Sequence, residues 1–156
     1  MIQIGLITTR PLLPTTDEAF LYQVYASTRA DELTPVPWPE EQKDAFVRMQ
    51  FELRQQQYRA EYPDAITEII LCDGIPSGTM ITLETGGAIL LVDIALLADF
   101  RGVGIGATIL CNLQKQGKKI VLHVLKENPA MHLYSRLGFV SVAEDAMYLR
   151  MEWSPQ

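Results

Sequence analysis

One stretch of the chain, residues 90–107 (LLVDIALLADFRGVGIGA), restricts the fold more than any other. Its first part, Leu90–Leu97, is almost entirely apolar, which is typical of a strand covered on both faces. Gly102, Gly104 and Gly106 then alternate with other residues, and a helical pattern follows. The first turn of a helix has free N–H groups, and glycines let the backbone approach a ligand closely. The stretch therefore predicts a cradle for a phosphate or pyrophosphate.

Length and composition favour one ordinary globular domain over residues 1–156, with 21% charged and 48% hydrophobic residues. The formal net charge of −6 disfavours a generic binder of nucleic acid or of anionic membranes. Cys72 and Cys111 lie in apolar runs without a C-x-x-C pattern, so we expect buried free thiols rather than a disulfide or a metal site.

The location of the protein is predicted from what the sequence lacks. No apolar stretch reaches the length of a membrane span, since Asp93 interrupts the longest one. The first residues, MIQIGLITTRP, show neither a basic leader segment nor a cleavage site. These observations favour a cytoplasmic protein.

Periodicity and turn residues predict the order β-α-α-β-β-β-α-β-α-β-β. This order is neither a regular parallel alternation nor an all-β array, so it predicts a mixed α/β domain. The expected strands lie near residues 2–9, 65–71, 77–84, 90–97, 120–125, 139–143 and 147–153, and the expected helices near 16–30, 40–61, 106–116 and 129–137.

The first two helices carry the least specific signals. Thr15 and Glu18 have the spacing of a capping box at the start of the first helix. Apolar residues in the second helix predict a core stripe, with aromatic residues on another flank that line an acceptor pocket, form a homodimer contact or simply pack. Trp38, in a proline-rich loop over residues 34–39, is the best candidate for acceptor contact. The predicted stripe is Ala45, Phe46, Met49 and Leu53, and the aromatic flank is Phe51, Tyr58 and Tyr62.

Two segments resemble the signatures of one known family. Arg101–Gly106 (RGVGIG) resembles the Q/R-x-x-G-x-G/A acetyl-CoA signature of the GNAT N-acetyltransferases. Asn128–Phe139 (NPAMHLYSRLGF) is similar to the second signature of that family, an Asn followed by Ala-x-x-Leu-Tyr and Gly-Phe. The chain departs from it at one point, because only Pro129 separates the Asn from the Ala where many members have two residues.

This resemblance implies a fold and a reaction. The fold is a mixed, mostly antiparallel sheet whose middle strands splay apart, flanked by about four helices. The reaction is acetyl transfer from acetyl-CoA to an amine in a ternary complex, without a metal. Pantetheine would pair with the strand backbone, pyrophosphate would lie on the glycine turn, and an asparagine and a tyrosine would contact the coenzyme. The implied residues are Ile94, Ala95, Leu96, Arg101, Gly102, Val103, Gly104, Ile105, Gly106, Ala107, Asn128 and Tyr134.

The chemistry needs an acid, a base and a donor for the oxyanion. The position of Tyr134 in the signature makes it the candidate acid for the departing thiolate, and the N–H of Leu96 is the candidate oxyanion donor. His123, five residues before Asn128, is the candidate base, although a strand histidine is also compatible with a role as a simple surface residue. Asp93 is the rival, either as a base acting through water or as a polar residue satisfied at the edge of its strand, and it is also a candidate for substrate binding. Glu84 and Glu68 are weaker candidates, and His132 is expected on the surface.

Three other classes of protein are the alternatives. The glycine spacing is not G-x-G-x-x-G, which disfavours a dinucleotide-binding oxidoreductase, and no Gly-Lys-Ser/Thr follows it, which excludes a P-loop. A non-catalytic acyl-CoA-binding module on the same fold stays open, because no base is unmistakable. The expected partners are acetyl-CoA and an amine acceptor, with the protein a monomer or a homodimer; the sequence does not identify the acceptor.

Overall fold

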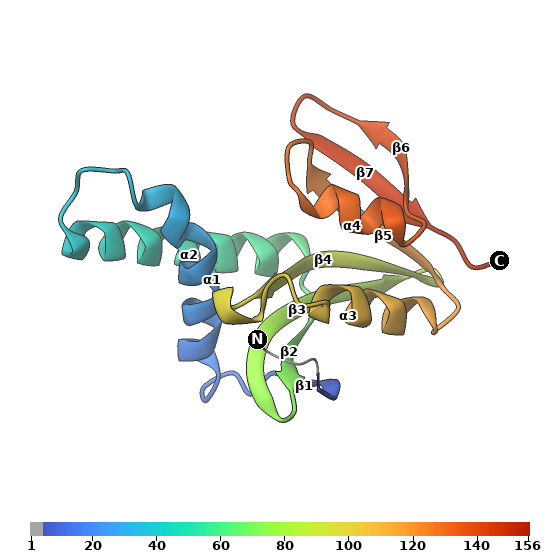
Figure 1. The fold of residues 1–156 in the computed structure, drawn as a ribbon, viewed down its shortest axis with the longest axis horizontal. Helices are drawn as coiled ribbons and strands as arrows, with labels where there is room; N and C mark the ends of the chain where they lie inside the picture. Colours follow the sequence, from blue (N-terminus) through green and yellow to red (C-terminus); the bar gives the residue numbers. More distant parts are fainter. Residues whose placement is uncertain (1–4) are drawn as a thin grey trace.

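A computed structural model describes residues 5–156, and its elements follow the predicted order (Figure 1). Most boundaries agree with the prediction within two residues, whereas the first helix extends to Leu33. Ile2 and Ile4 of the predicted first strand lie outside the described residues. The elements are β1 (Ile7–Pro11), α1 (Glu18–Leu33), α2 (Glu40–Glu61), β2 (Ile66–Cys72), β3 (Ile75–Thr85), β4 (Ala88–Leu96), a 3-10 turn η1 (Ala98–Phe100), α3 (Ile105–Gln114), β5 (Lys119–Leu125), α4 (Ala130–Arg136), β6 (Val140–Glu144) and β7 (Tyr148–Trp153).

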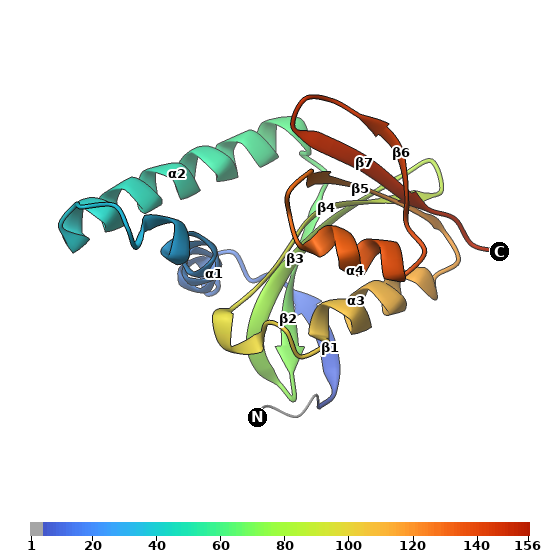
Figure 2. The same cartoon turned by 45° about the horizontal axis from the view of Figure 1, so that its top comes forward.

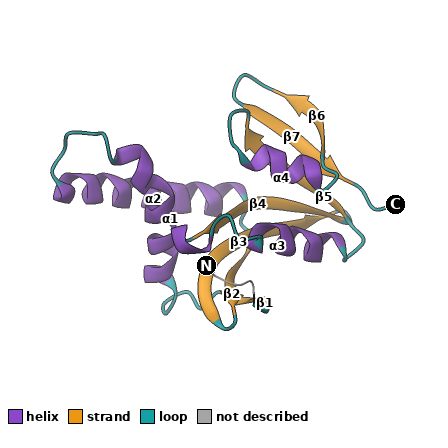
Figure 3. Cartoon of the chain, viewed as in Figure 1, coloured by secondary structure: helices purple, strands orange, loops and turns teal. Residues whose placement is uncertain are grey.

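In this part of the chain, seven strands form one sheet in the order β1-β2-β3-β4-β5-β7-β6 (Figure 3). Neighbouring strands are antiparallel except for β4 and β5, which are parallel. Tight hairpins join β2 to β3 and β3 to β4. Asp73-Gly74 and Gly86-Gly87 form the two turns, and all four residues have positive φ, as type I′ turns require. The predicted mixed, mostly antiparallel sheet is therefore confirmed.

The helices cover the sheet in two pairs (Figure 2). Helices α3 and α4 pack over the larger core, in which Ile89 and Leu91 of β4 meet Ile105 and Ile109 of α3. Helices α1 and α2 lie on the other side and share a smaller cluster, which includes Tyr25 and Phe51. Strand β4 is covered on both faces, as its apolar sequence predicts. No helix among residues 5–156 has the length and apolarity needed to cross a membrane.

The predicted capping box of α1 is wrong. Helix α1 begins after Asp17, and no side chain caps it. The buried Asp17 carboxylate instead forms an ion pair with Arg10, at 2.7 and 2.9 Å, and accepts a hydrogen bond from the Leu13 N–H. The Arg10 guanidinium and the Leu13 N–H hold the pKa of Asp17 at about 2. The acid thus ties the start of α1 to strand β1.

The predicted core stripe of α2 is also wrong. Met49 and Leu53 are 50% and 56% exposed, whereas Val47 and Phe51 are buried. Phe51 packs against Tyr22 and Tyr25 of α1, so the aromatic flank faces inward. The sequence offered two apolar flanks, and the contact with α1 determined which of them is buried.

The cysteines are free thiols, as predicted. Cys72 is buried and Cys111 is half-buried, and neither takes part in a disulfide.

Candidate active site

The centre of the sheet opens where β4 and β5 separate. Their parallel pairing ends at Leu91 and Leu122, although β4 continues to pair with β3 as far as Leu96. Beyond Leu122, strand β5 pairs only with β7. The edge of β4 from residue 92 to 96 therefore carries backbone groups without a partner strand, in the middle of the sheet.

The direction of these backbone groups follows from one hydrogen bond. The N–H of Leu97 donates to the carbonyl of Ser77, which immediately precedes Gly78 in β3. Successive N–H groups along a strand point to opposite edges, so the N–H and C=O of Leu96 point away from β3 and into the opening. The Leu96 carbonyl accepts a hydrogen bond of 2.9 Å from Nε of Arg101, which agrees with that direction.

A glycine turn closes one end of the opening. Gly102 and Gly104 have φ of 73° and 92°, a region that favours glycine, and α3 begins immediately afterwards at Ile105. Among the described backbone hydrogen bonds outside helices and strands, none uses an amide of residues 102–107 as donor. These amides are the free N–H groups of a helix N-terminus, which attract an anion. Nη2 of Arg101 donates to Ser27 Oγ at 3.0 Å, so Arg101 joins the turn to α1.

A cleft of about 360 Å³ runs from this turn along the edge of β4; we call it the α4 cleft. The side-chain oxygen of Asn128 accepts a hydrogen bond from the N–H of Ala130 at 2.9 Å, which fixes Asn128 at the start of α4. An asparagine that precedes a helix commonly caps it with such a bond. The lining includes Ile94, Leu96, Gly106, Asn128, Leu133 and Tyr134.

Tyr134 lies where the α4 cleft meets a second groove of about 280 Å³, between the separated ends of β4 and β5; we call this the splay groove. Its ring is buried and packs against Phe139 at 5.8 Å between ring centroids. Burial, reinforced by the negative charge of Asp93, raises the pKa of the Tyr134 phenol. The phenol therefore stays protonated at neutral pH and is able to donate a proton.

Asp93 faces the helices α1 and α2. In β4, Val92 is an extra residue in the register with β3, because Ile81 pairs with Asp93 and Thr82 pairs with Leu91. Such a bulge changes the alternation of side chains. Asp93 consequently lines a cavity against α1 and α2, which we call the α2 cavity, and it also lines the splay groove.

Arg54 of α2 pairs with Asp93, with 2.8 Å between Nη2 and Oδ1. The same guanidinium donates to the hydroxyl of Tyr58 from Nε at 3.0 Å and from Nη2 at 2.8 Å. Burial raises the pKa of the Asp93 carboxyl, and the Arg54 charge opposes that shift. Asp93 is therefore not at the edge of the sheet; it is an ion-paired acid on a central strand.

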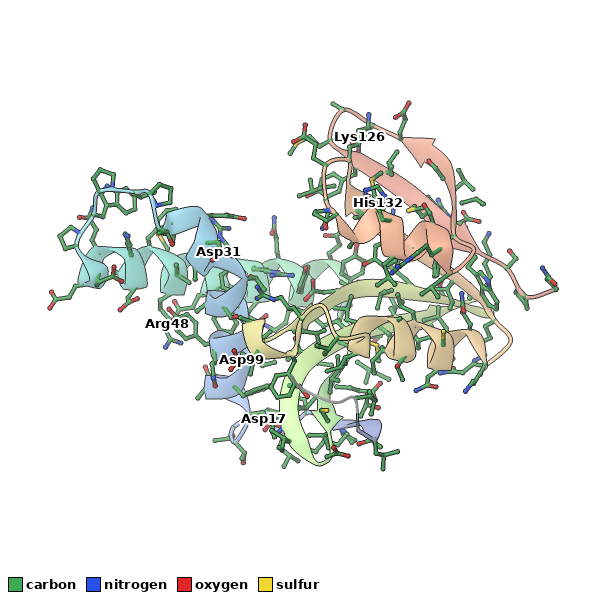
Figure 4. All side chains as sticks on the ribbon, viewed as in Figure 1. Asp17, Asp31, Arg48, Asp99, Lys126 and His132 are labelled. Atoms are coloured by element: carbon green, nitrogen blue, oxygen red, sulfur yellow. The ribbon has the colours of Figure 1, made fainter. Side chains whose placement is uncertain are left out.

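His123 lies on the exposed face of β5, opposite to the buried Leu122 and Val124, as the strand alternation predicts. It lines the splay groove together with Asp93 and Tyr134. The structure thus brings these three predicted residues to one groove. His132 is exposed on α4, which confirms its predicted surface position (Figure 4).

Trp38 is not brought to this site. Its ring packs edge-on against Phe46 at 5.4 Å, before the start of α2. Arg54 lies fourteen residues beyond the start of α2 at Glu40, which corresponds to about 21 Å of helix. Among the described residues, Trp38 does not line the α4 cleft, the splay groove or the α2 cavity. The prediction that it contacts the acceptor is therefore not supported.

Arg54 is the site residue that the sequence reasoning missed. Val47, Phe51, Arg54 and Tyr58 follow one another at spacings of four, three and four, which places an arginine in the buried stripe of α2. A charged residue in an apolar stripe needs a partner. The sequence contains this signal, but the prediction placed the core on the flank of Met49 and Leu53, where no arginine lies.

Comparison with known proteins agrees with this geometry. Residues 64–141, half of the chain, match the family described as acetyltransferase (GNAT) domain. The chain therefore belongs to the GNAT family of N-acetyltransferases. No curated protein sequence gave a significant match.

Solved structures show the same fold at low sequence identity. PaiA N-acetyltransferase from Thermoplasma acidophilum, solved in complex with coenzyme A, is 19% identical, with a TM-score of 0.68 over 97% of this chain and 99% of that chain. An acetyltransferase from Thermus thermophilus is 18% identical, with a TM-score of 0.68 over 99% and 100%. The ribosomal-protein-S18-alanine N-acetyltransferase from Escherichia coli is 18% identical, with a TM-score of 0.63 over 96% and 94%.

The ion pair between Arg54 and Asp93 predicts a pH-dependent loss of stability in Arg54→Gln. The substitution leaves a largely buried carboxylate without its cation, so we expect the free energy of unfolding to fall by about 1–3 kcal/mol at pH 7. Without Arg54, the pKa of Asp93 rises further above its unfolded value. The part of the loss that comes from the unpaired carboxylate is therefore greatest above that raised pKa, and it shrinks as pH falls toward about 4, where Asp93 is protonated in the folded state.

Urea unfolding at pH 7 and pH 4 measures this difference. Arg59→Gln is the matched control, because Arg59 lies on the same helix, is exposed and forms none of the described ion pairs. Equal losses in the two variants would show that the ion pair does not stabilise the fold.

Proposed function

We propose that the protein transfers the acetyl group of acetyl-CoA directly to a primary amine of a small molecule or peptide, in a ternary complex. One observation carries the proposal: Tyr134 stands where the α4 cleft and the splay groove meet, beside the unpaired edge of β4. A thioester in the first cleft and an amine in the second would meet at this residue. The continuous sheet supports a single acetyltransferase domain over residues 1–156.

Acetyl-CoA would occupy the α4 cleft in a fixed direction. Pyrophosphate would accept hydrogen bonds from the amides of residues 102–107, and the family's glycine signature lies at these positions. The pantetheine amides would pair with the open edge of β4 at Ile94, Ala95 and Leu96, where β5 provides no partner. Asn128 lines the same cleft and would contact the pantetheine. The remaining proposed contacts are those of Arg101, Val103, Ile105 and Tyr134.

The amine would enter the splay groove from the opposite side. A primary alkylamine is largely protonated at neutral pH, so the groove must hold an ammonium group and then remove its proton. We assign Asp93 to hold the ammonium group and His123 to accept its proton, since both line the groove. The N–H of Leu96, directed into the opening, would stabilise the oxyanion of the tetrahedral intermediate. Tyr134 would then protonate the departing thiolate.

Gly106→Asp tests the position of the coenzyme. The first side-chain atom at Gly106 would lie 3.6 Å from Cδ2 of Leu133, an ordinary contact, and an acid in the first turn of a helix is favourable, so the fold stays intact. The carboxylate would stand in the α4 cleft and repel the pyrophosphate. We expect affinity for acetyl-CoA, measured by calorimetry, to fall at least about tenfold (~1.4 kcal/mol) while the thermal midpoint is unchanged. Undiminished affinity would reject the proposed pose.

Tyr134→Phe tests the acid. Removing only the hydroxyl should lower kcat by about 10²- to 10⁴-fold, because the thiolate loses its proton donor, with little change in the affinity for acetyl-CoA. Tyr62→Phe, at the end of α2, is the matched control and should keep full turnover. A screen of amines, amino acids, polyamines and peptide N-termini with thiol-release detection first supplies the acceptor. Coenzyme binding without turnover of any acceptor would instead favour the non-catalytic module.

The pH dependence of kcat/KM separates the two roles in the groove. If His123 is the base, the pH profile has an acidic limb, and His123→Ala removes that limb together with most of the rate. Asp93→Asn should mainly raise the KM for the amine. The assignment is reversed if Asp93→Asn removes the limb and His123→Ala retains it.

A further inference from the structure

The outer face of α2 has an unusual charge pattern. Nine of the 22 residues of this helix are charged, yet none of them lies on the line that runs along the centre of the exposed face. At 100° per residue the line spans five turns, and two of its side chains, Met49 and Leu53, are large, apolar and at least half exposed. The residues of the line are Gln42, Ala45, Met49, Leu53, Gln56 and Ala60.

One rim of this line carries four exposed charges of alternating sign: Glu41, Arg48, Glu52 and Arg59. Arg48 lies over the ring of Tyr22 at 3.6 Å, which places this rim on the side of α1 (Figure 4). The other three form none of the ion pairs described within the chain. The rim therefore carries two acids and two bases, with no net charge, on a protein whose net charge is −6.

The positions of these charges are antisymmetric about the middle of the helix. Glu41 and Arg59 lie nine residues on either side of Gln50, and Arg48 and Glu52 lie two residues on either side of it. If a second copy of the helix runs antiparallel to the first and both are centred on Gln50, every acid of this rim therefore lies opposite a base. Met49 and Leu53 lie two residues on either side of Phe51, one residue from that centre, so the same reversal brings Met49 close to Leu53 with an offset of about 3 Å along the helix.

We infer that α2 is a homodimer interface, in which the exposed face packs antiparallel against the same face of a second copy of this chain. A two-fold axis makes each rim of one helix face the same rim of its partner, in reverse order. Glu41 would then meet the partner's Arg59, and Arg48 would meet the partner's Glu52. An unrelated partner would not require the pattern to be self-complementary.

The contact area sets the strength of this dimer. A helix of 22 residues is about 33 Å long, and a contact about 10 Å wide buries roughly 330 Å² per copy. A standard stable interface buries about 800 Å² per partner. The contact is smaller than that standard, so we expect a weak dimer that dissociates on dilution. The inner face of the same helix carries Arg54 and Tyr58, so the dimer contact would lie directly behind the acceptor side of the site.

Sedimentation equilibrium of the full chain tests the apolar line. Leu53→Lys should raise the dimer dissociation constant at least about tenfold, since two lysines are brought into the centre of the contact. This substitution also reduces the net negative charge, so general repulsion cannot explain a weaker dimer. Met147→Lys is the matched control, because Met147 is 60% exposed on the β6–β7 turn. A wild-type chain that stays monomeric up to about 500 µM, or equal effects of both variants, would overturn the inference.

Mixing of charge variants tests the antiparallel register. Glu41→Arg and Arg59→Glu should each weaken self-association, because like charges then meet across the interface. An equimolar mixture should recover the wild-type dissociation constant, since each acid again meets a base. Circular dichroism confirms that both variants keep their helices. Failure of the mixture to associate, with both variants folded, would reject this register.

Discussion

The early end of the ladder between β4 and β5 is the constraint on which the site depends. Backbone N–H and C=O groups inside a sheet need partners, and beyond Leu91 and Leu122 the two strands no longer supply them to each other. A ligand with amides of its own is suited to complete that edge. The surrounding elements meet this opening from different sides: the glycine turn at one end, α4 alongside, and α1 and α2 on the opposite face of the sheet.

The bulge at Val92 divides the chemistry between two faces of one strand. Regular alternation would place Asp93 on the same face as Leu91, within the larger core. The extra residue turns Asp93 toward Arg54, while Ile94 and Leu96 pack on the side of α3 and α4. One strand can therefore present backbone to a coenzyme and a carboxylate to an acceptor.

Local signals predicted most of the fold. Hairpin glycines, Pro39 before α2 and Asn128 before α4 act within a few residues, so the element order and most boundaries followed from the sequence. The glycine turn followed from its own residues as an anion site, and the resemblance to a family identified coenzyme A as its ligand and the tyrosine of α4 as a site residue. The remaining site residues depend on how elements pack. Arg54 was missed because the rotation of α2 against α1 is a tertiary property. The capping box of Thr15 and Glu18 was wrong because the start of α1 is instead tied down by Asp17, whose partner Arg10 comes from a strand.

The central claim is that the open edge of β4 receives the coenzyme. Amide NMR during titration with acetyl-CoA tests it most directly. The signals of Leu96 and of residues 102–107 should shift on binding, and the Leu96 amide should become protected from hydrogen exchange. An unchanged Leu96 amide, with shifts confined to α1 and α2, would contradict the account.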